Sequence, residues 1–248
     1  MRATSLFAGL LLAILAAAPV RAAAPYPSST VVTSLAWDTA TYTYGAVGGD
    51  IWPVTWHGDG TLRAAYGDGQ IGCPAKVSYG VVSIPSDAPS LAGLRGVGCG
   101  PAGTGKGKLL VLGSDGTSLY AQRAPQGSTT GSPLLRSADG GKTWTQGPSF
   151  TLFEAYVNFG RGNAGAPGGY LYVVDDVGTS LRLGRVAPAQ WNVPTAYQWF
   201  SGTATAPAWG SRSAASSATP TGGTLALARG AAPPLLMAPG RRVSSVCI

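Results

Sequence analysis

The sequence has few charged residues and a single histidine, and these scarcities exclude several classes of protein. Charged residues make up 11% of the 248 positions. With one histidine, three cysteines and no C-x-x-C motif, zinc binding and thiol redox chemistry have almost no support, so we predict no metal and no cofactor. The 37 glycines and 19 prolines favour many short strands and tight turns over helices.

Basic residues are concentrated near the two ends of the chain. The formal net charge is +7, but two arginines lie in residues 1–24 and four in residues 211–248. The middle of the chain contains the remaining 11 basic residues and all 10 acidic residues, so its net charge is +1. No basic stripe with interleaved aromatic residues remains, so nucleic acid is not a predicted partner.

No apolar run is long enough to span a membrane. The apolar residues 6–18 follow Met1 and Arg2 and precede three alanines at 22–24, the pattern of a secretory signal peptide. We therefore predict a signal peptide over residues 1–24, a folded domain over 25–210, and an exported protein without stable membrane insertion. In such a chain Cys73 and Cys99 are the predicted disulfide, with Cys247 left over.

Residues 49–69 form the stretch around which the prediction is organised. Apolar residues alternate before and after the turn at residues 58–60, as expected for a hairpin with one packed face. That register sets Trp56 opposite Leu62 and, continued outward, Asp50 opposite Asp68. Directly opposed carboxylates disfavour joint ionisation unless a cation lies between them, so Asp50 and Asp68 are a candidate acid/base or ligand pair. The alternative is that each aspartate bonds its own turn backbone.

Further hairpins are predicted over residues 109–123 and 170–186, after a strand over 76–84. Hairpins joined by Asp/Gly turns, with no convincing amphipathic helix, predict an all-β fold. The pattern leaves two arrangements open, a β-meander repeated around an axis and a β-sandwich.

Residues 137–144 resemble the Asp-box, Ser-x-Asp-x-Gly-x-Thr-Trp, which recurs in the β-propeller blades of sialidases and related glycan-active proteins. The defining positions are Ser137, Asp139, Gly141, Thr143 and Trp144. The Asp and Ser oxygens would take up backbone N–H groups, and glycine permits a positive φ. We predict a structural role for Asp139.

A second resemblance covers most of the chain before the tail. The stretches that carry it are residues 49–56, 66–69, 158–161, 164–166, 169–173 and 197–202. In that order they resemble a bacterial propeller family that includes endo-D-arabinanases acting on cell-wall arabinan. The resemblance implies a five-bladed β-propeller of four-stranded antiparallel blades, with a glycan cleft and with Asp50 and Asp68 as catalytic carboxylates.

The predicted function is that of a monomeric glycoside hydrolase-like protein acting on a polysaccharide. Glu154, the single glutamate, has apolar neighbours and is a candidate general acid; alternatively it is a strand residue facing solvent. Candidate sugar contacts, several of which could instead be core residues, are Trp52, Trp56, Tyr66, Tyr156, Asn158, Arg161 and Trp199. The competing hypotheses are a non-catalytic glycan-binding propeller and an inactive truncated relic.

Residues 211–248 depart from the family pattern. They lack strand alternation and resemble low-complexity or out-of-frame sequence, so we predict disorder there. Residues 30–209 suffice for about four blades at roughly 40–45 residues each, which predicts a truncated or frameshifted propeller with an open edge.

Overall fold

The computed structural model describes residues 34, 36, 48–85, 93–105, 107–124, 132–177, 180–202, 206–211, 224–225 and 246–247. The predicted signal peptide and most of the tail lie outside these residues. Within them the fold is all-β, as predicted, with strands and short 3-10 helices as its regular elements. No helix in the described part of the chain is long and apolar enough to cross a membrane.

The strands form three mainly antiparallel sheets, each consecutive in sequence for its first four strands. The first sheet contains β1 (Val54–Trp56), β2 (Thr61–Gly69), β3 (Val77–Pro85) and β4 (Arg95–Cys99). The second contains β5 (Lys108–Ser114), β6 (Leu119–Ala124), β7 (Ser132–Ser137) and β8 (Thr145–Phe150). These are the four-stranded antiparallel units that the sequence predicts.

The third sheet is larger, because two short strands from the tail join it. Its antiparallel strands are β9 (Ala155–Asn158), β10 (Leu171–Val177), β11 (Ser180–Val186), β12 (Gln198–Phe200) and β13 (Trp209–Gly210). The tail strands are β14 (Thr224–Leu225), which pairs with β11, and β15 (Val246–Cys247), which runs parallel to β9. Short 3-10 helices lie at η3 (Arg161–Asn163), η4 (Pro167–Gly169), η5 (Pro188–Gln190) and η6 (Pro194–Ala196).

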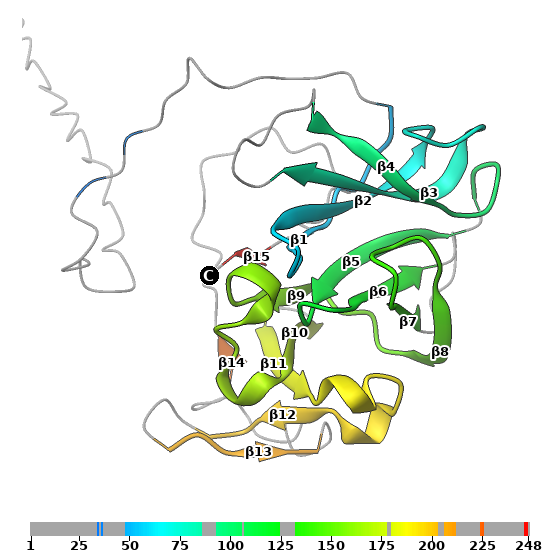
Figure 1. Ribbon diagram of the computed structural model, residues 1–248. Coiled ribbons are helices and arrows are strands. Elements are labelled where there is room, and N and C mark those ends of the chain that lie inside the picture. Colours follow the sequence, from blue (N-terminus) through cyan, green and yellow to red (C-terminus); the bar gives the residue numbers. More distant parts are fainter. Residues whose placement is uncertain are drawn as a thin grey trace, which may run out of the picture.

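The three sheets fan out from a common side, where their first strands β1, β5 and β9 meet (Figure 1). The Thr55 hydroxyl of β1 donates to Asn158 Oδ1 at the end of β9, at 2.5 Å. At the end of β1, His57 Nδ1 lies 3.0 Å from the Ser114 hydroxyl of β5. The inner strands are therefore joined by side-chain hydrogen bonds.

Glycines allow the chain to approach itself closely where these inner strands end. A Cβ atom on Gly58 would lie 2.2 Å from the Gly116 carbonyl oxygen, which is far inside van der Waals contact. A Cβ on Gly162 would meet the Cα atoms of Gly116 and Gly58 at 3.0 and 3.1 Å. The three sheets thus converge on three residues without side chains.

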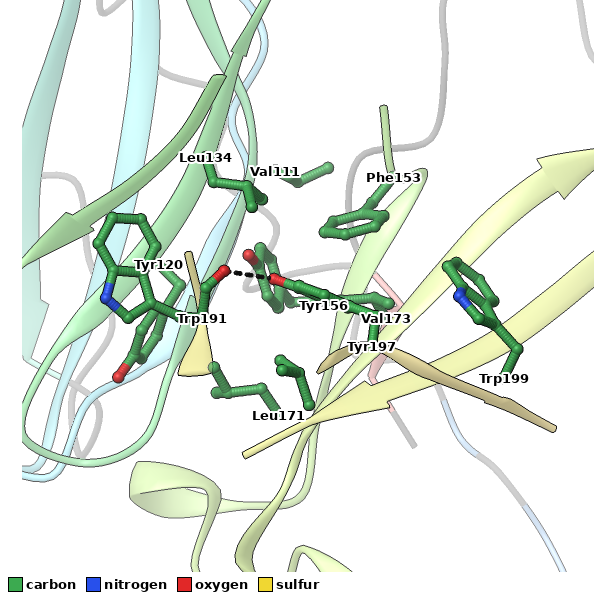
Figure 2. Close-up of a cluster of buried hydrophobic side chains, with 11 residues drawn as sticks. Val111, Tyr120, Leu134, Phe153, Tyr156, Leu171, Val173, Trp191, Tyr197 and Trp199 are labelled. Atoms are coloured by element: carbon green, nitrogen blue, oxygen red, sulfur yellow. Dashed lines mark hydrogen bonds between the residues drawn. The ribbon is translucent and has the colours of Figure 1, made fainter. Parts of the chain in front are cut away.

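The largest hydrophobic cluster lies between the second and third sheets (Figure 2). It buries large aromatic side chains from both, including Tyr120, Tyr156 and Trp199, and the Tyr197 hydroxyl donates to the Trp191 carbonyl at 3.0 Å. Fully burying each large apolar side chain contributes roughly 1.5–3 kcal/mol. A second cluster, which includes Val81 and Leu119, joins the first and second sheets in the same way.

The turn between β7 and β8 is closed by its own side chains. Asp139 Oδ1 accepts from the backbone N–H of Thr143 at 2.9 Å, while Oδ2 accepts from the Thr143 hydroxyl at 2.6 Å. The Ser137 hydroxyl donates to Asp139 and accepts from the N–H of Gly141, whose φ is 107°. Trp144 packs against the cluster between the first two sheets. These contacts agree with the structural role predicted for the Asp-box residues.

Cys73 and Cys99 form the predicted disulfide, with Cα atoms 5.8 Å apart. Cys73 lies in the turn after β2, and Cys99 is the last residue of β4. The bond therefore ties the turn that follows Asp68 to the outer strand of the first sheet. A loop of this size corresponds to about 3 kcal/mol of stabilisation in the chain-entropy model.

Candidate functional site

The hairpin of β1 and β2 has the predicted register near its turn. Trp56 pairs with Leu62 and Val54 with Ala64, and the His57 N–H donates to the Thr61 carbonyl at 2.9 Å. Gly60 has a φ of 88°, the conformation that this three-residue connection needs. The pattern of apolar residues therefore predicts this half of the hairpin correctly.

Beyond Val54 the predicted register is wrong. Asp50 pairs with Gly67 instead of Asp68, because the β1 side carries one extra residue between Asp50 and Val54. Ile51 takes up this residue with a φ of 51°, an unusual conformation for a β-branched side chain. Asp68 has a φ of 49°. Ile51 and Asp68, both left-handed, thus mark the place where the regular pairing around the two carboxylates is interrupted.

A lysine from the second sheet joins the two carboxylates. Lys108 Nζ lies 2.5 Å from Asp50 Oδ2 and 2.8 Å from Asp68 Oδ2. The two Oδ2 atoms cannot lie further apart than these distances combined, about 5.3 Å. The side chain of Asp50 is 53% exposed, that of Asp68 25% and that of Lys108 21%. The structure therefore brings the predicted pair together through a cation.

Lys108 changes what the pair can do chemically. Burial opposes the charge of Lys108, but its hydrogen bonds to Asp50 and Asp68 outweigh this and raise its pKa above the ordinary value. One ammonium facing two carboxylates leaves the cluster with a net charge of −1 when all three groups are ionised. The sequence predicts resistance to joint ionisation only where no cation lies between the carboxylates, and Lys108 supplies such a cation.

Gly67 gives the lysine its path to the carboxylates. A Cβ atom on Gly67 would lie 2.7 Å from Lys108 Cδ and 2.5 Å from Asp50 Oδ1. Any side chain at this position would therefore collide with both partners of the ion pair. Gly67 does not have a positive φ, so glycine is needed here for close packing and not for its backbone conformation.

Only one of the two carboxylate oxygens of Asp68 has a hydrogen-bond partner among the described residues. Its Oδ1 atom is buried and receives no hydrogen bond from any residue that the structure describes. Leaving a buried acceptor unsatisfied costs roughly 1–3 kcal/mol.

Tyr66 is a buried core residue next to the site. The prediction that it contacts sugar is wrong. Its side chain is completely buried, and its hydroxyl donates to the Ile71 carbonyl at 2.8 Å. Burial raises the pKa of Tyr66, so the hydroxyl stays protonated. The ring packs against Trp52 with centroids 5.6 Å apart. Trp52 is partly buried and could still offer an edge to a ligand.

The chain matches no family model, and no curated protein matches it. The arabinanase-family resemblance therefore remains a prediction from the motifs.

Arg161 and Asn158 contact other parts of the first hairpin than the end that carries Asp50. Arg161 donates to the Gly58 carbonyl at the opposite end of β1, eight residues from Asp50. At about 3.3 Å per extended residue, eight residues span at most about 26 Å. Asn158, the last residue of β9, accepts a hydrogen bond from the hydroxyl of Thr55 in the middle of β1.

The remaining predicted sugar contacts are Tyr156, Trp199 and Trp56, and Glu154 is the remaining candidate acid. Tyr156 and Trp199 are buried in the cluster between the second and third sheets, so neither ring can stack on a sugar. Trp56 is 38% exposed, but it lies towards the hairpin turn. Glu154 is partly buried, precedes β9, and its N–H donates to the Val174 carbonyl at 2.8 Å.

Sequence reasoning missed Lys108. The predicted hairpin begins at residue 109, so Lys108 falls just outside it, whereas in the structure Lys108 is the first residue of β5. The available signal was chemical, because two opposed carboxylates resist joint ionisation unless a cation lies between them, and Lys108 directly precedes a predicted strand. Nothing local in the sequence names the partner, because Lys108 lies 58 residues from Asp50.

Proposed function

We propose that this chain is an exported glycan-active protein of the glycoside hydrolase type, with Asp50 and Asp68 as its working pair. The observation that supports this most is that the Oδ2 atoms of Asp50 and Asp68 lie no further apart than about 5.3 Å. The left-handed conformations of Ile51 and Asp68 agree with a functional site, where backbone strain tends to concentrate.

The separation of the carboxylates favours a retaining mechanism. Retaining glycosidases have carboxyl groups about 5–5.5 Å apart, and inverting enzymes need about 6.5–9.5 Å to admit a water molecule. The upper limit of about 5.3 Å between the Oδ2 atoms lies below the inverting range. One carboxylate would attack the anomeric carbon while the other protonates the departing oxygen. Water would then release the sugar and return the proton.

The arrangement of the sheets favours a β-propeller. Three consecutive antiparallel sheets meet along their first strands, and the glycines at the strand ends permit close convergence. The closed Asp-box turn between β7 and β8 agrees with this fold. The Cys73–Cys99 disulfide favours export, since such bonds persist in oxidising compartments. The family resemblance makes arabinan the first substrate to test and a monomer the expected state.

A non-catalytic glycan-binding role is the second candidate, and Lys108 favours it. A general acid must hold a proton, whereas an ammonium group beside a carboxyl group generally favours its ionised form. A pair of ionised carboxylates can still accept hydrogen bonds from sugar hydroxyls. Binding would then occur without cleavage.

The two candidates are separated by incubating the mature chain with arabinan and a panel of other polysaccharides. Release of reducing sugar by the wild-type chain, lost in Asp50→Asn, would support the hydrolase. Retention on an immobilised glycan without any release of sugar would support the binding role. A chain that neither cleaves nor binds any glycan would overturn both.

A further inference from the structure

Lys108 reaches the carboxylates from a different sheet. It begins β5, whereas Asp50 precedes β1 and Asp68 lies within β2. The position of its ammonium group therefore depends on how the first two sheets pack. Its stem passes the backbone of Gly67, where no side chain could fit. The lysine is held on a defined path to both carboxylates.

We propose that Lys108 is the positioning residue of the Asp50–Asp68 pair, whose two carboxylates it holds at one ammonium group. This inference rests on the proposed function, because it assigns the lysine a role in the same site. It goes further by naming the group that sets how close the two carboxylates lie.

The physical reason is the repulsion between two carboxylates at this distance. Without a cation, carboxylates this close resist joint ionisation, and one keeps its proton to a higher pH. Among the described residues, Asp50 and Asp68 are the charged groups that face Lys108. Removing its charge should therefore change the titration of the pair directly.

The fold should depend much less on this lysine. Asp50 is half exposed, and ion pairs of exposed groups contribute little to stability. A purely structural role would therefore predict unchanged titration together with a change in stability. The positioning role predicts changed titration in a folded protein.

The test compares Lys108→Met, which keeps much of the stem but removes the charge, with the wild type. Carboxyl carbon resonances of Asp50 and Asp68 are followed by NMR from pH 3 to 8. We expect the titration midpoint of one aspartate to rise by about one unit or more in Lys108→Met. Lys108→Arg should restore the wild-type midpoint, since it returns the positive charge.

Lys142→Met is the matched control, because Lys142 is exposed in the Asp-box turn. It should leave both aspartate resonances unchanged. Unchanged midpoints in a folded Lys108→Met protein would overturn the inference. A shift in Lys142→Met equal to that in Lys108→Met would also overturn it, because the effect would not come from the contact.

A second measurement separates this inference from the proposed function. On a glycan that the wild type cleaves, Lys108→Met should move the basic limb of the kcat/KM profile upward by the same amount as the NMR midpoint, because that limb reports the aspartate that must hold the proton. An unmoved limb would overturn the inference and leave the hydrolase in place. If the wild type cleaves nothing, the proposed hydrolase fails, and the NMR titration still decides the role of Lys108.

Discussion

Asp50 and Gly67 exchange two backbone hydrogen bonds, at 2.8 Å from Asp50 N to Gly67 O and at 2.6 Å in the other direction. This bridge places the Asp50 side chain over Gly67, which has no side chain. The space above Gly67 is taken by the Lys108 stem and the Asp50 carboxylate. The residue after Gly67 is Asp68, so the bridge brings both carboxylates to one ammonium group.

Asp50→Asn and Asp68→Asn should each lower turnover on a cleaved glycan by at least about 10²-fold, the low end for a lost acid/base group. The folding transition should hardly move, since the ion pairs replaced are partly exposed. Kinetics and thermal unfolding of the same samples check this. Asp59→Asn, at the other end of the hairpin, is the matched control and should keep wild-type turnover. Full turnover in either site variant would remove that aspartate from the mechanism.

Gly67→Ala should damage the site by steric displacement. The added methyl group would lie 2.5 Å from Asp50 Oδ1 and 2.7 Å from Lys108 Cδ. We expect turnover to fall by about 10²-fold, the effect of moving a reacting group by roughly 1 Å. Gly48→Ala is the control, because a Cβ there meets no atom within 4 Å. Equal turnover in the two variants would show that the close packing at Gly67 is dispensable.

Asp139→Asn should lower stability in a pH-dependent way. Hydrogen bonds from Thr143 hold the pKa of Asp139 well below its usual range. The carboxylate therefore stabilises the fold above about pH 4, and this contribution is lost as the pH falls through the lower folded-state pKa. We expect a loss of about 1 kcal/mol at pH 7, discounted for the exposed turn, and a smaller loss at pH 3. Urea unfolding at both pH values measures it, and an equal loss at both would contradict the assignment.

His57 should make stability fall as the solution is acidified from pH 7.5 to 5.5. Burial lowers the pKa of His57 most, with Arg63 acting in the same direction and Asp59 and Asp115 opposing. Near pH 6.5 the unfolded chain binds a proton at His57 while the folded chain does not. Each pH unit of acidification in this range therefore lowers the free energy of unfolding by up to about 1.4 kcal/mol. Urea unfolding across this range should show the slope in the wild type and a weaker one in His57→Gln. Because the sequence has one histidine, its imidazole can also be titrated directly by NMR.

Part of the site could be predicted because it depends on local patterns. The turn glycines and the alternating apolar residues determine the pairing of Trp56 with Leu62. The prediction of Asp50 opposite Asp68 was wrong by one residue, because Ile51 forms a bulge where the alternation has already ended. Period-2 reasoning carries no information about an extra residue in such a stretch.

By itself, the sequence determined the all-β class, the hairpin turn, the Asp-box turn and the pairing of Cys73 with Cys99. These features depend on φ preferences, side-chain alternation and the small number of cysteines, all of which are written locally or can be counted. The tertiary structure alone decided that Lys108 lies between the carboxylates and that Tyr66 and Trp199 are buried. The position of Lys108 and the burial of Trp199 depend on how separate sheets pack against each other, and residues 58 positions apart meet only after that packing has formed. Tyr66 is buried within the first sheet, by contacts with the segments on either side of its strand.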